Sequence, residues 1–422
     1  MRVEVADIPA VVARARTAAA ALRVLPTSEK DRALRTLADL LEAESEALLA
    51  ANAGDVADAA SSGRRPALVD RLRLTPERIR AMAQGVRRVA ALPDPVGEML
   101  HARTMPNGMR LAQMRVPVGV ILMIYEARPN VTVDAAALCV KAGNASILRG
   151  GREARRSNAF LGGLLMRIGL PAGTVQVIAE SDHDLVTGLL RADGIDLCIP
   201  RGGERLIRSV VEHARMPVLK HFKGACHMFV DRDADLDMAG RLVVNAKTHR
   251  PSTCNALETL LIDAPVAEAF LPRVVRLLRA AGVEVRGDER TRAVLQRVDP
   301  PLAAEVVPAT EADWGAEYLD LILGVRITDG LDEALAHIQQ YSTGLADAIV
   351  TQDQERAQRF VAAVDSAAVL VNASTRLVDG GEFGLGAEIG ISTDRIGPRG
   401  PMGLAELTSL KWVVMGTGQV RQ

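Results

Sequence analysis

The segment Val118-Gly119-Val120-Ile121-Leu122-Met123-Ile124-Tyr125 is apolar almost throughout, and it opens a regular alternation of short apolar runs and longer amphipathic segments. Short apolar runs bounded by turn residues are typical of buried strands. Similar runs follow at 145–148, 174–178, 195–199 and 226–230, with helical patterns such as 153–168 and 204–213 between them. This alternation predicts a parallel, doubly wound α/β sheet.

A second set of strand and helix patterns follows Asp231. Helices are expected at 235–246 and 266–280, and strands at 257–262, 283–286, 321–327, 346–351 and 368–371. The first hundred residues are expected to be helical, since Thr75-Pro76-Glu77 is an N-cap followed by proline at the first helical position. The sequence therefore predicts two α/β domains with additional N-terminal helices.

Composition and charge are those of an ordinary globular protein. The chain has 422 residues, of which 48% are hydrophobic and 24% are charged, with a net charge of -1. This balance gives no general attraction to nucleic acid or to an anionic membrane surface. The longest apolar run is too short to span a bilayer, and the N-terminus lacks the basic then apolar order of a signal peptide. We therefore expect a cytoplasmic protein without a nucleic-acid or membrane partner.

The four cysteines lie far apart without a C-x-x-C pair, so neither a metal site nor a disulfide framework is expected. Cys254 lies between an expected helix end and an expected strand, after the basic residues Lys247, His249 and Arg250. Cationic neighbours favour the reactive thiolate, which indicates a nucleophile. A simpler interpretation also fits, in which basic residues complement a helix end, Pro251 stops the helix and the cysteine is a small hydrophobe.

Two glycine turns follow expected strands of the first domain, at Arg149-Gly150-Gly151-Arg152 and at Arg201-Gly202-Gly203-Glu204. Glycines at a strand-to-helix turn let backbone N–H groups approach a phosphate at the helix N-terminus. Neither turn is a G-x-G-x-x-G fingerprint, and two tight turns with solvated arginines explain them equally well. By themselves the turns leave a nucleotide site open.

Longer motifs give a more specific result. The most specific are Tyr125-Glu126-Ala127-Arg128-Pro129-Asn130-Val131-Thr132 and Arg250-Pro251-Ser252-Thr253-Cys254-Asn255. Others lie at 117–120, 141–144, 148–151, 371–376, 383–388 and 400–404. In this order, and over nearly the whole chain, they strongly resemble the γ-glutamyl phosphate reductase family of the aldehyde dehydrogenase superfamily. Only the first hundred residues lack such a motif, and they resemble the family in their general helical character alone.

The resemblance implies an α/β, aldehyde dehydrogenase-like fold with two doubly wound parallel-sheet domains and a small β oligomerisation arm. The cofactor-binding domain is expected at 1–106 and 118–230, the catalytic domain with Cys254 at 231–375, and the arm at 107–117 and 385–422. A lone apolar terminal strand, here 410–415, is an aggregation hazard unless it is paired, so a homo-oligomer is also expected on physical grounds.

The activity implied by the resemblance is the NADPH-dependent reduction of γ-glutamyl phosphate to glutamate 5-semialdehyde with release of phosphate, in proline biosynthesis. Cys254 occupies the nucleophile position of the family. Its thiolate would attack the acyl phosphate to give a thioester, which hydride from NADPH would reduce. A functional coupling to a glutamate kinase is left open.

Other site residues are also implied by the resemblance. The oxyanion donors are expected to be the backbone N–H of Cys254 with the side chain of Asn130 or Asn255. Glu317 falls where the superfamily has a glutamate that contacts the nicotinamide ribose, although a helix-end carboxylate explains it equally well. Substrate carboxylate and phosphate need cationic partners, for which the candidates are Arg128, Arg250 and Arg376.

The two glycine turns are implied to bind the cofactor. Arg149, Gly150 and Gly151 are expected at the adenosine end, where relatives carry a lysine, and Arg201, Gly202 and Gly203 at the nicotinamide end. With Arg152 and Arg155 nearby, a 2′-phosphate is accommodated, which favours NADP over NAD without making the choice strict.

Two alternative functions remain open. Hydrolytic aldehyde dehydrogenases carry a water-activating glutamate before the cysteine, whereas Leu219-Lys220-His221-Phe222-Lys223-Gly224 contains no carboxylate, which favours a reductase. His221 as a base keeps a hydrolytic NAD(P)-dependent enzyme open. A non-catalytic scaffold of the same fold is the other alternative.

Overall fold

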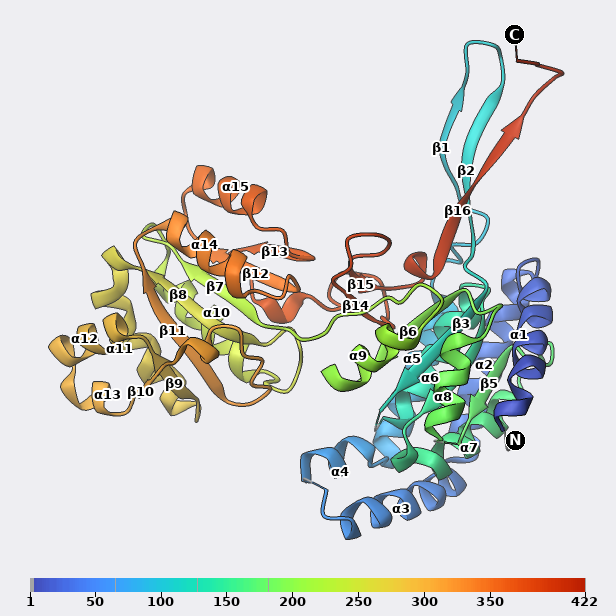
Figure 1. Cartoon of the computed structure of the whole chain (residues 1–422), viewed down its shortest axis with the longest axis horizontal. Helices are drawn as coiled ribbons and strands as arrows, with labels where there is room; N and C mark the ends of the chain where they lie inside the picture. The colour runs from blue at the N-terminus through green and yellow to red at the C-terminus, as the bar shows by residue number, and fades with distance from the viewer. Residues whose placement is uncertain (1–3, 65, 127, 181, 422) are drawn as a thin grey trace. The chain divides into compact units, whose positions relative to one another are not determined.

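The computed structural model describes residues 4–64, 66–126, 128–180 and 182–421, which form two compact units (Figure 1). Unit 1 comprises Met1–Lys220, Gly384–Gly390 and Met402–Gln422, and unit 2 comprises His221–Phe383 and Ile391–Pro401. The chain therefore passes from one unit to the other four times.

The sheet of unit 1 has four parallel strands in the order β5-β4-β3-β6. Its elements are β3 (Val120–Tyr125), α6 (Pro129–Lys141), β4 (Ala145–Gly150), η2 (Arg152–Ala154), α7 (Arg155–Leu165), β5 (Val175–Ile178), α8 (His183–Arg191), β6 (Leu197–Arg201) and α9 (Glu204–His213). From β3 the chain adds strands on one side and then returns to add β6 on the other. In open α/β sheets, ligands bind at the carboxyl ends of the strands where this change of direction occurs.

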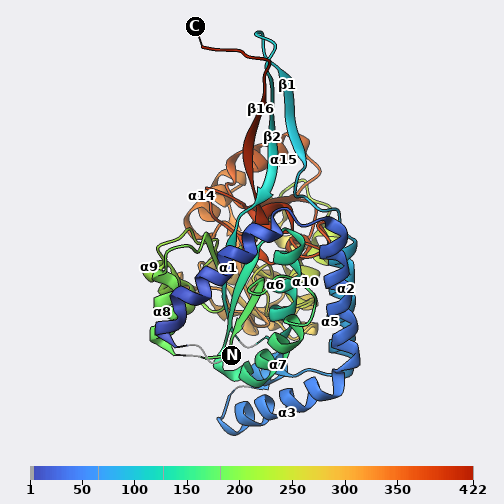
Figure 2. The ribbon, with the colours of Figure 1, turned by 90° about the vertical axis from the view of Figure 1, so that its right-hand side faces the viewer.

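Helices cover both faces of this sheet, because alternate residues of β3 point to opposite sides. Ile121, Met123 and Tyr125 share a core with α2 and α5, and the intervening β3 side chains share another core with α1. Figure 2 shows α1 passing in front of the unit and α2 at its edge. The N-terminal elements are η1 (Val5–Asp7), α1 (Ile8–Leu22), α2 (Thr27–Ala43), α3 (Ser45–Ser61), α4 (Pro66–Leu72) and α5 (Pro76–Ala91). Each fully buried aliphatic side chain contributes about 1.5–3 kcal/mol, which explains the apolar run that opens the alternation.

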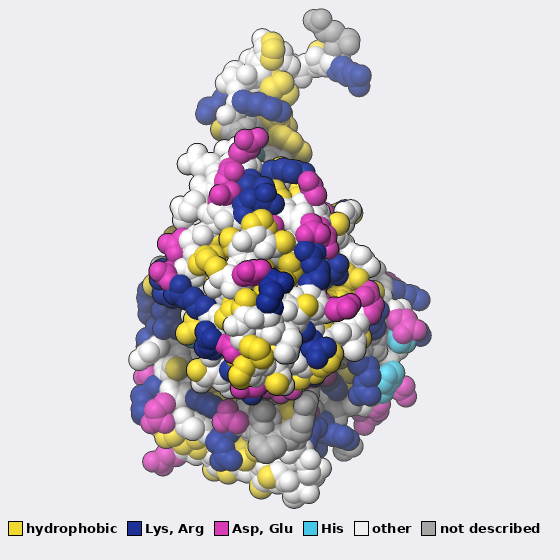
Figure 3. Space-filling view, turned by 90° about the vertical axis from the view of Figure 1, so that its left-hand side faces the viewer, with side chains coloured by type: hydrophobic (Ala, Val, Ile, Leu, Met, Phe, Trp, Pro, Cys, Tyr) yellow, Lys and Arg dark blue, Asp and Glu magenta, His cyan; other side chains and the backbone are white. Residues whose placement is uncertain are grey.

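Unit 2 contains a seven-stranded sheet in the order β10-β9-β11-β8-β7-β12-β13, with parallel pairing throughout. Its strands are β7 (Cys226–Val230), β8 (Leu257–Asp263), β9 (Glu284–Gly287), β10 (Val307–Pro308), β11 (Ile322–Thr328), β12 (Ala346–Val350) and β13 (Ala368–Val371). Its helices are α10 (Leu236–Thr248), α11 (Ala264–Ala280), α12 (Glu289–Val298), α13 (Pro300–Ala304), η3 (Glu311–Asp313), α14 (Leu331–Tyr341), α15 (Gln354–Ala363) and η4 (Thr375–Leu377). The expected fold with two parallel sheets is thus confirmed. Side chains of both charge signs are interspersed on the face shown in Figure 3.

One expected domain boundary is wrong. The segment 226–230 was expected to complete the first domain, but it forms β7 and pairs with β8 and β12 in unit 2. The boundary therefore lies at 220/221 rather than at 230/231. The end of the catalytic domain also lies beyond the expected 375, since unit 2 continues to Phe383. An apolar strand has the same burial pattern in either sheet, so its sequence does not reveal its partners.

A three-stranded antiparallel sheet extends from unit 1. It consists of β1 (Met99–Thr104), β2 (Arg110–Pro117) and β16 (Thr408–Met415), with β2 in the middle. The expected arm segments 107–117 and 385–422 therefore need correction, because β1 joins the arm from the expected cofactor domain. Residues 391–401, which were expected in the arm, belong instead to unit 2. The short strands β14 (Gly390–Ser392) and β15 (Gly400–Met402) pair with each other at the two ends of this segment. The short helix η5 (Ala405–Leu407) then precedes β16.

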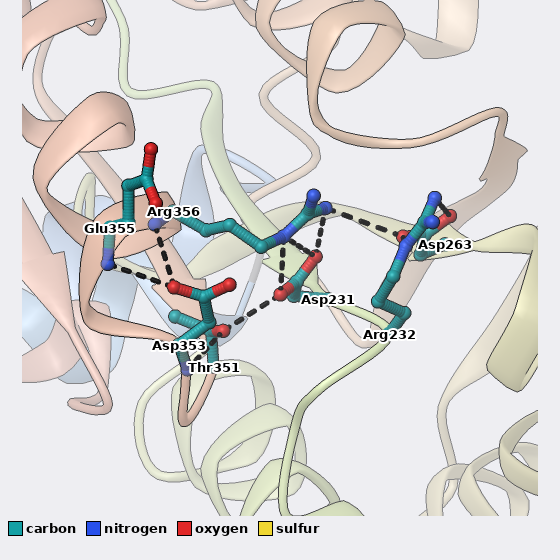
Figure 4. Close-up of polar contacts among 7 residues, drawn as sticks. All are labelled: Asp231, Arg232, Asp263, Thr351, Asp353, Glu355 and Arg356. Atoms are coloured by element: carbon teal, nitrogen blue, oxygen red, sulfur yellow. Dashed lines mark hydrogen bonds and ion pairs between the residues drawn. The ribbon is translucent and has the colours of Figure 1, made fainter.

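A buried polar network closes the carboxyl end of the sheet of unit 2 (Figure 4). Arg356 donates to Asp231 from Nε at 2.8 Å and approaches Asp263 at 3.5 Å, while Arg232 donates to Asp263 at 2.8 Å. Burial raises the pKa of Asp231, but hydrogen bonds from Arg356 and Thr351 outweigh it, so that this pKa is lowered. The network compensates two fully buried carboxylates and fastens α15 to the strand ends.

Candidate active site

Cys254 lies in a short turn between α10 and β8, at the amino end of the sheet of unit 2. The turn begins where Pro251 stops α10, and it is closed by hydrogen bonds from Thr253 Oγ1 to the Arg250 carbonyl at 2.8 Å and from Ala256 N to the Thr253 carbonyl at 3.0 Å. This end of the sheet is opposite to the ion-pair network of Figure 4.

Cys254 is the one partly exposed cysteine among the four, all of which lie in the described part of the chain. Burial raises the pKa of the Cys139 and Cys198 thiols to about 12, and it raises the pKa of Cys226 well above its ordinary value. Raised pKa values keep these three thiols protonated and unreactive. Accessibility therefore singles out the cysteine that the sequence pattern indicates.

The backbone of Cys254 is held by a close contact that the sequence did not reveal. The Cys226 thiol donates to the Cys254 carbonyl oxygen at 3.4 Å, and the Cα of Gly224 lies against the same oxygen. A Cβ atom at Gly224 would lie 1.8 Å from that oxygen. Glu317 Oε1 accepts a hydrogen bond from Gly224 N at 2.8 Å, so the carboxylate expected to contact the cofactor ribose holds this glycine in the structure.

Gly224→Ala is therefore expected to lower kcat by at least about 100-fold, because relieving a backbone clash must displace the nucleophile turn, and misplacement by about 1 Å costs a factor of this size. Steady-state kinetics with a thermal unfolding curve measure the effect. Gly163→Ala is the matched control, since a Cβ atom there meets nothing within 4 Å and the residue lies within α7, outside the proposed site. Near-normal kcat in the folded Gly224→Ala protein would show that the contact is not needed.

Lys247 and Glu258, which precede and follow Cys254 in the sequence, form a fully buried ion pair. Lys247 Nζ lies 2.6 Å from Glu258 Oε2, and neither side chain is exposed to solvent. Burial raises the pKa of Glu258 to about 7, although Lys247 opposes this shift. Burial lowers the pKa of Lys247. The sequence suggested Lys247 as a cation for the thiolate or the substrate, whereas its ammonium group is paired inside the protein.

Asn255 and Arg376 are joined to each other. The Arg376 guanidinium donates to Asn255 Oδ1, and Asn255 Nδ2 donates to the Val378 carbonyl at 2.9 Å. Asn255 is buried, and its amide thus fastens the turn after β13 to the Cys254 turn. These bonds give Asn255 a positioning role, and its amide carries a second N–H group that the expected role as oxyanion donor would use. Arg250 is exposed beside the same turn.

The remaining expected site residues lie in unit 1. Asn130 is in the first turn of α6, and its Nδ2 donates to Asp134 at 3.0 Å. Arg128 precedes this helix at its N-cap. Ala127 of the same motif lies outside the described residues. Unit 2 therefore brings together Cys254, Asn255, Glu317 and Arg376, and unit 1 contains Asn130, Arg128 and both glycine turns.

The two glycine turns lie at the carboxyl ends of β4 and β6, where close packing requires glycine. A Cβ atom at Gly150 would lie 2.0 Å from Asn158 Nδ2, and one at Gly202 would lie 2.7 Å from Glu126 Oε2. Gly203 N donates to the same Glu126 oxygen at 3.0 Å. This N–H group, expected to face the cofactor, is therefore bonded to a carboxylate in the structure.

Sequence reasoning missed Gly224, Cys226, Glu126 and Glu258. Each acts through a contact that is distant in sequence, and only Gly224, as a glycine before a strand, carries a recognisable local signal. Across the described ranges, no group of three or more His, Cys, Asp and Glu residues is arranged to hold a metal ion. Within the same ranges, the helices include none that is long and apolar enough to cross a membrane.

Comparison with known proteins places the chain in a family. Residues 1–294 match the model of the aldehyde dehydrogenase family. The chain is 54% identical over 414 residues to Gamma-glutamyl phosphate reductase of Moorella thermoacetica, covering 97% of each protein. It is 52% identical over 420 residues to the protein of the same name from Thermobifida fusca, covering 98% of this chain and 99% of the relative.

A solved structure agrees with these similarities. The crystal structure of Gamma-glutamyl phosphate reductase from Thermotoga maritima superposes with a TM-score of 0.94 at 44% identity, and the match covers 99% of this chain and 100% of the other. The chain belongs to the γ-glutamyl phosphate reductases of the aldehyde dehydrogenase family.

Proposed function

We propose that this chain reduces γ-glutamyl phosphate to glutamate 5-semialdehyde with NADPH and releases phosphate, as a step of proline biosynthesis. The observation that carries the proposal is the partly exposed Cys254, held in a backbone-fixed turn in a chain more than half identical to two proteins named Gamma-glutamyl phosphate reductase. Cytoplasmic location and coupling to a glutamate kinase are parts of the same proposal.

The chemical role of Cys254 follows from its accessibility. Its thiolate attacks the γ-carbonyl carbon of the acyl phosphate, the C–O bond to phosphate breaks, and phosphate leaves with the bonding electron pair to give a thioester. The Cys254 backbone N–H and the side-chain amide of Asn130 or Asn255 are the proposed donors to the developing oxyanion. Cys226 and Gly224 fix the Cys254 carbonyl, so that the thiolate starts from a defined position.

The residues of unit 1 fit a nicotinamide dinucleotide, the cofactor class of the family. The glycine turn after β4 lies at the carboxyl end of a parallel strand, and a buried Arg149 Nε there has no hydrogen-bond partner among the described atoms. Such turns accept phosphates. Arg149, Gly150 and Gly151 are proposed to hold the adenosine end, and Arg201, Gly202, Gly203 and Glu317 the nicotinamide end. When bound, NADPH supplies the hydride that reduces the thioester.

Arg128, Arg250 and Arg376 are proposed to bind the substrate carboxylate and phosphate. Arg376 donates a hydrogen bond to Asn255, the residue after the nucleophile, and this contact with the Cys254 turn supports the proposal. The exposed Arg250 precedes the nucleophile by four residues. Guanidinium groups bind carboxylates and phosphates with paired hydrogen bonds.

The arm is proposed to form a homo-oligomer. Three large apolar residues of β16 are more than half exposed, with Trp412 and Val414 at 55% and Met415 at 63%. An exposed apolar edge strand pairs readily with another chain.

A hydrolytic aldehyde dehydrogenase is the second candidate, and His221 is the observation that favours it. Its Nδ1 lies 2.8 Å from the Ile391 carbonyl oxygen, which fixes the proton on Nδ1 and makes Nε2 the basic nitrogen. The segment 219–224 nevertheless contains no carboxylate, and a thioester that must exchange with phosphate gains nothing from activated water.

The phosphate requirement of the reverse reaction separates these candidates. NADPH formation from glutamate 5-semialdehyde and NADP is expected to rise saturably with inorganic phosphate and to stop after one equivalent per site without it. The assay is followed by absorbance, with sulfate as the ionic-strength control. Sustained turnover at the same rate without phosphate would support the hydrolytic enzyme instead.

A further inference from the structure

The loop before β11 is fastened to the segment before β7 at two adjacent residues, and both segments belong to unit 2. Gly224 N donates a hydrogen bond to Glu317 Oε1 at 2.8 Å. Lys223 Nζ donates one to the Gly315 carbonyl oxygen at 2.8 Å. The bonded residues are 93 and 92 positions apart in the sequence, so these contacts arise only when unit 2 folds. They join the Glu317 side chain to the backbone that precedes β7.

A third bond fixes the same loop on the other side of Glu317. Leu319 N donates to Glu258 Oε1 at 3.4 Å, and the other Glu258 oxygen binds Lys247 at 2.6 Å. Leu319 has a φ of 53°, a left-handed conformation that branched side chains rarely adopt. Such a conformation persists where the surrounding contacts impose it. Glu317 therefore lies between two anchored residues of the loop.

Gly224 is the link between this loop and the turn that holds Cys254. A Cβ atom at Gly224 would lie 1.8 Å from the Cys254 carbonyl oxygen and 2.9 Å from the Cys254 Cα, so the two backbones are in direct contact. This contact blocks movement of Gly224 toward the turn, and the bond to Glu317 opposes movement away from it. The Cys254 carbonyl therefore meets a fixed backbone surface only while Glu317 holds Gly224.

We infer that Glu317 is a positioning residue for the Cys254 thiolate, and that it acts through Gly224 without a bound cofactor. This role is additional to the proposed contact of Glu317 with the nicotinamide end of the cofactor. It rests on the proposed function only in taking Cys254 as the nucleophile. Acylation needs the thiolate and the backbone N–H of Cys254 in one defined geometry, so Glu317 serves the step that precedes hydride transfer.

The choice of side chain distinguishes an effect of position from an effect of charge. Glu317→Gln keeps a carbonyl oxygen that accepts from Gly224 N but carries no charge, whereas Glu317→Ala removes both. A carboxylate near a thiolate raises the pKa of the thiol. An effect of charge would therefore move the pH profile of acylation to lower pH equally in both variants, whereas an effect of position lowers the rate in Glu317→Ala alone.

Acylation by p-nitrophenyl acetate measures this step without NADPH. The Cys254 thiolate attacks the ester carbonyl carbon, the C–O bond breaks, p-nitrophenolate leaves with the electron pair, and the acetyl group stays on sulfur as a thioester. The first equivalent of p-nitrophenolate per site appears as a burst, followed by absorbance. Glu317→Ala is expected to lower the burst rate constant by about 10-fold or more, the contribution of one hydrogen bond to a charged group. Glu317→Gln is expected to stay within about threefold of the unaltered protein.

Glu305→Ala is the matched control, since it removes an exposed carboxylate of unit 2 that pairs with Arg279 at 3.0 Å. Its burst should equal that of the unaltered protein. Glu317 is only partly buried, so the fold should be retained in its variants, and a thermal unfolding curve checks this. A residue that contacts only the cofactor would raise the KM for NADPH and leave the burst unchanged.

An unchanged burst in the folded Glu317→Ala protein, or an equally slow burst in Glu317→Gln, overturns the assignment. The proposed function is tested separately, because the burst requires neither γ-glutamyl phosphate nor NADPH. The expected pattern of bursts in a protein that does not reduce γ-glutamyl phosphate would contradict the proposed function and support the positioning role of Glu317.

Discussion

Cys254→Ser is expected to reduce NADPH-linked turnover by at least about 10⁴-fold, as removal of a catalytic nucleophile does in other enzymes. A serine hydroxyl at neutral pH is a much weaker nucleophile than a thiolate. The change replaces one sulfur by one oxygen in a partly exposed turn, so the fold should be retained. Steady-state assays of the reaction in both directions measure the loss of turnover, and a thermal unfolding curve shows whether the fold is retained.

The matched control is Cys198→Ala, which alters a buried cysteine of β6 in the other unit. Its kcat per folded molecule should equal that of the unaltered protein. Undiminished turnover in Cys254→Ser would assign the nucleophile to another group. If the unaltered protein also lacks turnover with γ-glutamyl phosphate and NADPH, the non-catalytic scaffold is the better account.

Lys247→Met is expected to lower the free energy of unfolding by about 3–5 kcal/mol, because it leaves the Glu258 carboxylate buried without its partner. We also expect kcat to fall, because Lys247 and Glu258 lie on either side of the turn that holds Cys254. The double variant Lys247→Met, Glu258→Leu removes both charges and is expected to recover most of the lost stability. Urea unfolding of the two single variants, the double variant and the unaltered protein completes a double-mutant cycle.

The pH dependence of this loss has a definite sign. A carboxyl group whose pKa is raised on folding binds more protons in the folded state, so its contribution to stability falls as pH rises from its unfolded value to its folded value. For Glu258 this window runs from 4.5 to about 7 in the unaltered protein. Without Lys247 the folded pKa rises further, so Lys247→Met should be more destabilised at pH 8 than at pH 5.5. A loss independent of pH would contradict the buried carboxylate as its cause.

The sequence predicts the main architecture because hydrophobic periodicity is a local property. The apolar run of β3 has helices on both faces, and β8 follows the Cys254 turn as expected. Sheet membership is not local, and 226–230 was placed in the wrong sheet for that reason. β7 forms its hydrogen bonds with β8 and β12, and nothing within its own five residues specifies those partners.

The candidate site shows the same contrast between features that a local sequence pattern predicts and features that depend on tertiary packing. Cys254 stands out in a specific motif, and the structure adds its exposure relative to the other cysteines. The sequence shows Lys247 and Glu258 only as two charged residues, since burial arises when α10 and β8 pack.

Direct detection of the acylated nucleophile tests the central claim most closely. The protein is incubated with glutamate 5-semialdehyde and NADP without phosphate, quenched in acid, digested and analysed by mass spectrometry. The account predicts one glutamyl group on the peptide that contains Cys254, which disappears when phosphate is added before the quench. NADPH formation with Cys254 unmodified, or with the glutamyl group on another residue, would contradict it.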